Sequence, residues 1–220
     1  MRRNGNKAKR WRPMSAGKIA LAVSASLVAL VWLSACGSNP PRNPNNSCAI
    51  FEEKTGWYRA ALDSQQRWGV PVHVQMAIVY QESSFEDDAR PERRKLLWVI
   101  PWKRPSSAYG YAQAIDGTWE WYIESTGNSG ADRDDFDDAV DFIGWYGHQS
   151  NRRLGIAKSD AYNQYLAFHE GHGGYERRTY RNKQWLLQAA RRVQNRSNDY
   201  RSQLQACASS LSTRKPLWSF

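Results

Sequence analysis

The sequence predicts a mainly α-helical domain that follows an export signal, and three observations support this prediction. Apolar residues recur at helical spacing from residue 47 to residue 207, glycines and prolines separate the periodic segments, and no strand-rich region appears. The chain has 220 residues, of which 41% are hydrophobic, so it is long enough for one domain with a buried core and additional segments.

The first 35 residues are typical of a secretory signal. They carry seven basic residues and no acidic one, and a basic stretch precedes an apolar run from Ile19 to Leu33. That run is shorter than the roughly 20 residues that a membrane-spanning helix needs. Removal of residues 1–35 lowers the net charge from +10 to +3, which argues against a nucleic-acid-binding protein.

The signal ends in Leu33-Ser34-Ala35-Cys36-Gly37, which resembles a bacterial lipobox. The resemblance implies that Cys36 receives lipid and becomes the new N-terminus; the alternative is an uncleaved anchor with an incidental cysteine. Because Gly37 rather than aspartate follows, the resemblance to sorted lipoproteins implies the outer membrane, with the domain facing the periplasm. Residues 36–46 are rich in proline and asparagine, and we predict that they form a tether.

Two cysteines remain if Cys36 carries lipid. Cys48 and Cys207 lie near the two ends of the mature chain and can pair in an oxidising compartment, tying the first helix to the last. The alternative is two unrelated free thiols.

The predicted helices follow one another from residue 47 to residue 207. Gly69 can end the first helix, and Pro71 can open the second at its first turn. Residues 90–108 contain three prolines and are expected to form a loop or a short hairpin. We expect helices over residues 47–68, 71–82, 110–124, 135–154, 160–170 and 183–207. Three tryptophans, Trp119, Trp145 and Trp185, are expected in the core.

A glutamate interrupts the apolar face of the second helix. Val72, Met76 and Val79 recur at helical spacing, and Glu82 continues the series. Burial raises the pKa of a carboxyl group. A carboxylic acid still protonated near neutral pH suits glycosidic-bond cleavage, because the leaving oxygen must gain a proton. From the local pattern alone, the alternative is a structural glutamate paired with Arg90 or Arg93.

Three ordered segments resemble the motifs of the soluble lytic transglycosylase (SLT) family. Glu82-Ser83 resembles the "ES" motif, residues 110–113 (GYAQ) resemble "GLMQ", and residues 167–173 (AFHEGHG) resemble "AYNAGxG". Phe168 takes the tyrosine position of the third motif and His169 the asparagine position. Residues 161–163 (AYN) match its letters but lack the glycines that follow.

This resemblance implies a lysozyme-like, goose-type helical domain with a groove over residues 47–220. It also implies a murein lytic transglycosylase, which cleaves the bond between N-acetylmuramic acid and N-acetylglucosamine without water and leaves a 1,6-anhydro end. Glu82 would act first as acid and then as base. The predicted substrate-binding residues are Ser83, Tyr109, Gly110, Tyr111, Gln113, Phe168 and His169, with Trp102 of the 91–106 insert as a wall of the groove or part of a local core. The expected partner is the glycan strand, bound by a monomer without cofactor, metal or nucleic acid.

One departure from the motifs leaves alternatives open. Phe168 lacks the hydroxyl that the family's tyrosine offers to the catalytic carboxyl, and Tyr162, Tyr111 or His169 are candidates to replace it. One alternative is a hydrolytic muramidase with a second carboxylate, for which the candidates are Asp116, Glu120 and Glu170. The other is a non-catalytic envelope lipoprotein that binds peptidoglycan. A zinc peptidase is disfavoured, because residues 169–172 (HEGH) are one residue shorter than HExxH.

Overall fold

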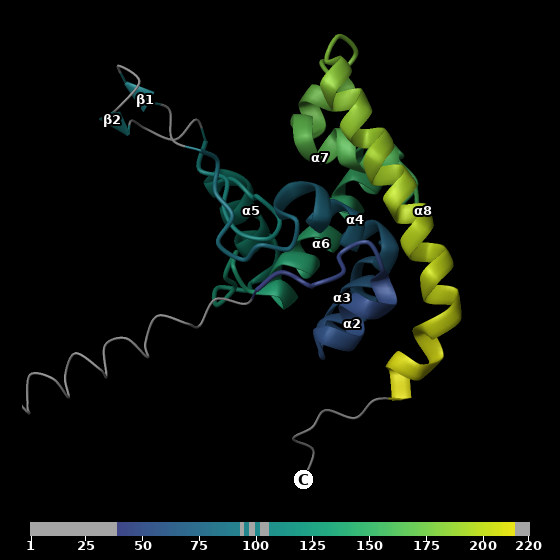
Figure 1. Ribbon diagram of the computed structural model, residues 1–220. Helices are drawn as coiled ribbons and strands as arrows, with labels where there is room; N and C mark the ends of the chain where they lie inside the picture. Colours follow the sequence, from purple (N-terminus) through teal and green to yellow (C-terminus); the bar gives the residue numbers. More distant parts are fainter. Residues whose placement is uncertain (1–38, 93–94, 97–99, 102–105, 214–220) are drawn as a thin grey trace, which may run out of the picture. The chain divides into compact units, whose positions relative to one another are not determined.

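The computed structural model describes residues 39–92, 95–96, 100–101 and 106–213, and this part of the chain is mainly α-helical (Figure 1). Its seven helices are α2 (Ser47–Glu53), α3 (Trp57–Trp68), α4 (Val72–Ser83), α5 (Asp116–Thr126), α6 (Phe136–Leu154), α7 (Ala161–Glu176) and α8 (Gln184–Thr213). Between α4 and α5, β1 (Lys95–Leu96) pairs antiparallel with β2 (Ile100–Pro101), as the hairpin expectation had it. The predicted fold class is confirmed. The predicted signal peptide, Cys36 and Trp102 lie outside the described residues.

The first predicted helix is two helices. Lys54, Thr55 and Gly56 separate α2 from α3, and Gly56 has a positive φ of 109° that interrupts the helical path. The Asn46 side chain caps α2 by accepting a hydrogen bond from the backbone nitrogen of Ala49 at 3.0 Å. The expectation of one continuous helix over residues 47–68 is therefore wrong.

Helix α6 lies at the centre of the core and packs against α3, α4, α5 and α7. Its buried face includes Phe142, Trp145 and Tyr146, as the helical spacing predicts. Gly144 permits the close approach of α3, because a Cβ atom there would lie 2.3 Å from Ser64 Oγ. This packing fixes the position of α6, which supplies part of the apolar wall of the site described below.

Helix α8 runs along α2, α4 and α7 (Figure 1). The predicted bridge between Cys48 and Cys207 is present, with a Cα–Cα distance of 6.0 Å across 159 positions of sequence. It joins α2 to the C-terminal part of α8. No helix in the described part of the chain is both long enough and apolar enough to span a membrane.

The core prediction for the tryptophans holds for two of the three. Trp119 and Trp145 are buried, whereas Trp185 is 57% exposed. Leu186, in the first turn of α8, takes the buried position and leaves Trp185 facing solvent. The expectation that Trp185 belongs to the core is therefore wrong.

Two further boundaries differ from the predicted ones and shape the site. Residues 110–115 form a turn, so α5 begins at Asp116 rather than near residue 110. Helix α7 extends to Glu176, beyond the predicted end at residue 170, and bends at Gly171, whose φ of 72° and ψ of 159° are not helical. The turn and the bend both border the cavity described next.

Candidate active site

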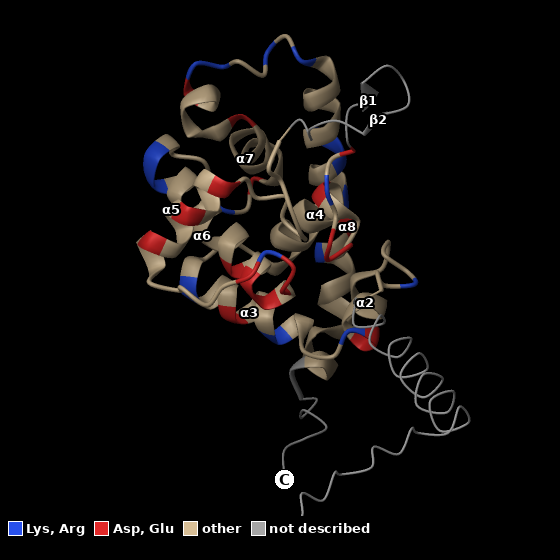
Figure 2. Ribbon diagram, turned by 90° about the vertical axis from the view of Figure 1, so that its left-hand side faces the viewer, with Lys and Arg blue, Asp and Glu red and all other residues tan. Residues whose placement is uncertain are grey.

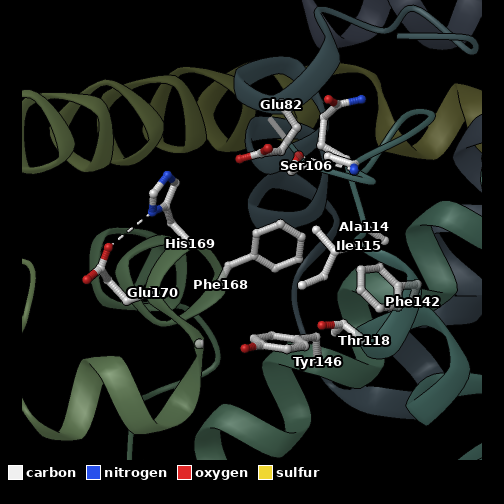
Figure 3. A pocket seen from close by; sticks show the side chains of 13 residues that line it. Glu82, Ser106, Ala114, Ile115, Thr118, Phe142, Tyr146, Phe168, His169 and Glu170 are labelled. Carbon is white, nitrogen blue, oxygen red and sulfur yellow. Dashed lines mark hydrogen bonds and ion pairs between the residues drawn. The ribbon is translucent and has the colours of Figure 1, made fainter. Parts of the chain in front are cut away.

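A cavity of about 450 Å³ brings together residues from all three motif segments (Figure 3). Its walls come from the end of α4, the turn before α5, α5 itself, α6 and the middle of α7. The lining residues are Glu82, Ser106, Ala108, Gln113, Ala114, Ile115, Thr118, Phe142, Tyr146, Phe168, His169, Glu170 and Gly171. Three segments far apart in the sequence thus form one concave surface, as expected for a ligand site.

Glu82 occupies the last turn of α4, and its carboxyl group reaches the cavity (Figure 3). The side chain is half-buried and lines the cavity. Burial raises the pKa of Glu82 to about 7, and a hydrogen bond from Tyr165 partly opposes that rise. Both the protonated and the ionised form of Glu82 are therefore populated near neutral pH.

The hydroxyl group beside Glu82 belongs to Tyr165, a buried residue of α7. Burial and the nearby Glu82 carboxyl raise the pKa of Tyr165, so the phenol remains a hydrogen-bond donor. The residues expected to replace the hydroxyl that Phe168 lacks were Tyr162, Tyr111 and His169, and Tyr165 was not among them. Tyr165 lies one turn before Phe168 and His169 on α7, but the spacing within α7 does not show which neighbouring helix its side chain meets.

Phe168 and three other side chains form the apolar part of the cavity wall. The Phe168 ring lies 6.0 Å from Phe142 and 5.2 Å from Tyr146 between ring centroids, in edge-to-face contacts. Ile115 lines the cavity and is 47% exposed. In Figure 3 these side chains lie across the cavity from Glu82. An apolar wall opposite a protonatable carboxyl suits the apolar face of a sugar ring.

Gln113 lines the cavity, and its amide nitrogen holds the turn in place. Nε2 donates to the carbonyl oxygens of Ala89 at 2.8 Å and Gly110 at 2.9 Å. The backbone of Gln113 has a φ of 48°, uncommon for a residue with a side chain. The amide oxygen is then the atom of Gln113 that can accept a hydrogen bond from a bound molecule.

The structure does not bring Ser83 or Tyr109 to the cavity wall. Ser83 is buried, and its Oγ donates to the carbonyl oxygen of Val79 at 3.2 Å, stabilising the end of α4. The Tyr109 hydroxyl donates to Asp134 at 2.7 Å, and the Arg90 guanidinium lies 4.2 Å from the centre of its ring. Ser83 therefore stabilises the end of α4, and Tyr109 stabilises the segment before α5, behind the cavity wall.

Gly110 and Tyr111 likewise lie behind the wall. Gly110 has a φ of 76°, and a Cβ atom there would stand 1.9 Å from the carbonyl oxygen of Arg133. Tyr111 is buried, with its ring centroid 5.6 Å from that of Trp57. The turn therefore requires glycine at position 110, and this turn positions Gln113 at the cavity.

The cavity contains a second carboxyl group, that of Glu170. Lys183 Nζ lies 2.7 Å and 2.9 Å from its two oxygens, His169 Nδ1 lies 3.2 Å away, and Thr179 donates a further hydrogen bond. Although burial acts in the opposite direction, these partners hold the pKa of Glu170 below its usual range. Glu170 is a fixed carboxylate, whereas Glu82 is a carboxyl that can exchange a proton.

The other candidates for a second carboxylate lie outside the cavity wall. Asp116 pairs with Arg133 at 2.9 Å, and Glu120 is exposed on α5. Neither side chain lines the cavity.

The two histidines of the HEGH segment contact different helices. His169 lies 5.1 Å from Trp185 of α8 between ring centroids, whereas His172 stacks on Tyr146 of α6 at 4.5 Å. Burial and the nearby Arg153 lower the pKa of His172 to about 4. Within the residues that the structure describes, no group of three or more histidine, cysteine or acidic side chains is placed to hold a metal ion.

A family model for the transglycosylase SLT domain matches residues 24–207. Comparison with curated proteins gave no match, and comparison with solved structures gave none.

Proposed function

The chain belongs to the transglycosylase SLT domain family, and from that premise we propose that it is a murein lytic transglycosylase with Glu82 as its catalytic acid and base. The family implies a peptidoglycan-acting function of this type. The observation that carries the finer proposal is that, of the two carboxyl groups among the described residues of the cavity, Glu82 is the one whose pKa lies above its usual value, raised by burial to about 7.

In the first step Glu82 acts as a general acid. Its carboxyl proton passes to the oxygen that bridges N-acetylmuramic acid and N-acetylglucosamine, and the bond from C1 to that oxygen breaks. A pKa near the working pH provides both a protonated fraction and a sufficient driving force for proton transfer. The N-acetylglucosamine side leaves with a new hydroxyl, and positive charge develops at C1 of the muramic acid residue.

In the second step the ionised Glu82 acts as a base. It takes the proton from the 6-hydroxyl of the same muramic acid residue, whose oxygen bonds to C1 and closes the 1,6-anhydro ring. Glu82 regains its proton, and no water is consumed. Because the attacking hydroxyl is tethered to the reacting sugar, one carboxyl group is sufficient.

Tyr165 supports both steps as a positioning residue. Its hydrogen bond orients the Glu82 carboxyl and stabilises the ionised form produced by the first step. This hydroxyl serves in place of the one that Phe168 lacks, which removes the main argument for a non-catalytic binding protein. Gln113 is the candidate hydrogen-bonding partner for the sugar, and Phe168 and Ile115 are candidate packing surfaces.

A hydrolase on the same fold is the second candidate, and Glu170 is the residue that would favour it. A hydrolase of the inverting type needs a second carboxylate free to activate water. The carboxylate oxygens of Glu170 instead accept hydrogen bonds from Lys183, Thr179 and His169. We therefore assign Glu170 a structural part and favour the transglycosylase.

The envelope location forms part of the same proposal. We propose that Cys36 is lipidated and anchors the domain to the outer membrane, facing the periplasm, through the tether of residues 36–46. The lipobox-like sequence supports this, and the disulfide agrees with an oxidising compartment. A Cys36→Ala variant should move from the membrane fraction to the soluble fraction; unchanged membrane retention would contradict lipid anchoring.

The test of the catalytic assignment is the release of soluble fragments from purified peptidoglycan by three proteins. We expect Glu82→Gln to abolish release, because glutamine cannot donate and then accept a proton. We expect the matched variant Glu170→Gln to retain activity. Full activity of Glu82→Gln would refute the assignment, and loss of activity in a folded Glu170→Gln protein would favour the hydrolase.

A further inference from the structure

Two large hydrophobic side chains are exposed in the described part of the chain: one lines the cavity, and the other contacts a residue of its wall. Ile115, 47% exposed, lines the cavity itself. Trp185 is 57% exposed, and its ring centroid lies 5.1 Å from that of His169, which also lines the cavity. The exposed ring of Trp185 therefore lies beside a residue of the cavity wall and is open to a bound molecule.

The segment next to Trp185 is basic. The α7–α8 loop, residues 177–183, carries Arg177, Arg178, Arg181 and Lys183, and Figure 2 shows basic positions along it in blue. The three arginines are exposed. Lys183 is paired with Glu170, whereas the three arginines form no ion pair within the residues that the structure describes. Glu176 is the exposed acidic residue adjacent to them, so the surface has an excess of positive charge.

This loop is held rigidly against α7. Lys183 and Thr179 both bind Glu170, and the Thr179 backbone nitrogen donates to the carbonyl oxygen of Gly174 at 3.1 Å. The ring of Tyr180 stacks on that of Tyr175 with 5.2 Å between centroids. Because these contacts already order the loop backbone, less backbone freedom is lost when an anion binds to its arginines.

The α7–α8 loop is also linked to the cavity. Glu170 binds Lys183 of the loop and His169 of the cavity wall at the same time. The basic surface is therefore joined to the catalytic cavity through one buried carboxylate, and the exposed ring of Trp185 lies beside His169.

We propose that Trp185, Arg178 and Arg181 form an accessory site for the carboxylate-bearing stem peptide of peptidoglycan. The inference rests on the proposed function, because the peptide is attached to the muramic acid residue whose glycosidic bond lies at Glu82. A glycan held in the cavity carries that peptide outward past the wall. Guanidinium groups pair with peptide carboxylates, and the tryptophan packs on the aliphatic parts of the chain.

An anionic membrane surface would also attract these arginines. The peptide is favoured because the basic loop adjoins the cavity wall through Glu170 and His169 and includes an exposed ring at that junction. A purely electrostatic membrane contact would not require this continuity.

The test measures binding rather than cleavage. The full chain carrying Glu82→Gln is titrated with glycan strands that keep their stem peptides and with strands from which an amidase has removed them. In this background Arg178→Gln with Arg181→Gln should raise Kd for peptide-bearing strands about two- to tenfold. Kd for stripped strands should stay the same. Trp185→Ala should likewise raise Kd for peptide-bearing strands and leave Kd for stripped strands unchanged. The effect should shrink at high salt.

A matched control removes the same charge elsewhere. Arg59 on α3 and Arg152 on α6 are exposed, and Arg59→Gln with Arg152→Gln should change neither Kd. Equal Kd values for both strands in all variants would overturn the accessory site while leaving the proposed function intact. Failure of both strands to bind would refute the function together with the site. The same proteins are also titrated with phosphatidylglycerol vesicles. If the arginine substitutions weaken binding to the vesicles and leave both glycan Kd values unchanged, the surface is a membrane contact instead.

Discussion

Replacement of Glu82 by glutamine should stabilise the protein at alkaline pH. Burial raises the pKa of Glu82 from 4.5 to about 7. Between pH 4.5 and about pH 7, Glu82 is therefore protonated in the folded state and ionised in the unfolded state. Its contribution to stability is fully present below pH 4.5 and is lost as the pH rises through 7.

The size of the effect follows from the same values. Each pKa unit corresponds to about 1.4 kcal/mol, so ionised Glu82 destabilises the fold by roughly 3 kcal/mol at pH 8 relative to pH 4. Glutamine has nearly the same volume and no charge. We expect Glu82→Gln to gain roughly 3 kcal/mol at pH 8, or about 6–12 °C in Tm for a domain of this size.

The assay is chemical or thermal unfolding of both proteins from pH 4 to pH 9. His73 and His172, whose pKa values burial lowers to about 4, act in the opposite sense, but they are present in both proteins. The difference between the two curves therefore isolates Glu82. Exposed Glu120→Gln is the matched control for charge removal: it keeps Glu82, so its curve should run parallel to that of the wild type. Parallel curves for wild type and Glu82→Gln would refute the burial argument.

Three further substitutions test the supporting structure. Tyr165→Phe removes a hydrogen bond to the ionised carboxyl, so the pKa of Glu82 should rise above 7. The alkaline limb of the pH dependence of kcat/KM should then move to higher pH, and an unchanged limb would contradict the role of this hydroxyl. Cys48→Ser opens a bridge across 159 positions and should lower the free energy of unfolding by up to roughly 4–5 kcal/mol, with reductant then changing wild type but not the variant. Gly110→Ala places a Cβ atom 1.9 Å from a carbonyl oxygen at a φ of 76° and should destabilise the protein by more than about 2 kcal/mol, whereas a normal Tm would show that the turn can yield.

The sequence predicts well those features that depend on local pattern. The helical spacing of Val72, Met76 and Val79 predicts that Glu82 ends a buried face, and α4 has this arrangement. The glycines after residue 167 distinguish the segment that lines the cavity from residues 161–163, which do not line it.

Features that depend on how helices meet could not be predicted in this way. Tyr165 reaches Glu82 because α7 packs beside α4, a contact that the spacing within either helix does not encode. Trp185 is apolar enough for a core position, yet its neighbour Leu186 takes that position and the ring remains exposed. Ser83 and Tyr111 sit inside motif-like segments and serve the packing behind the wall rather than the wall itself.

The chemistry at Glu82 can be decided by digesting purified peptidoglycan in water enriched in oxygen-18 and weighing the fragments. A transglycosylase closes the 6-hydroxyl on C1, so each product should be one water lighter than the reducing fragment and should carry no heavy oxygen. The Glu82→Gln protein should yield neither species. Reducing ends that incorporate oxygen-18 would show that water attacks C1 and would contradict the one-carboxyl mechanism.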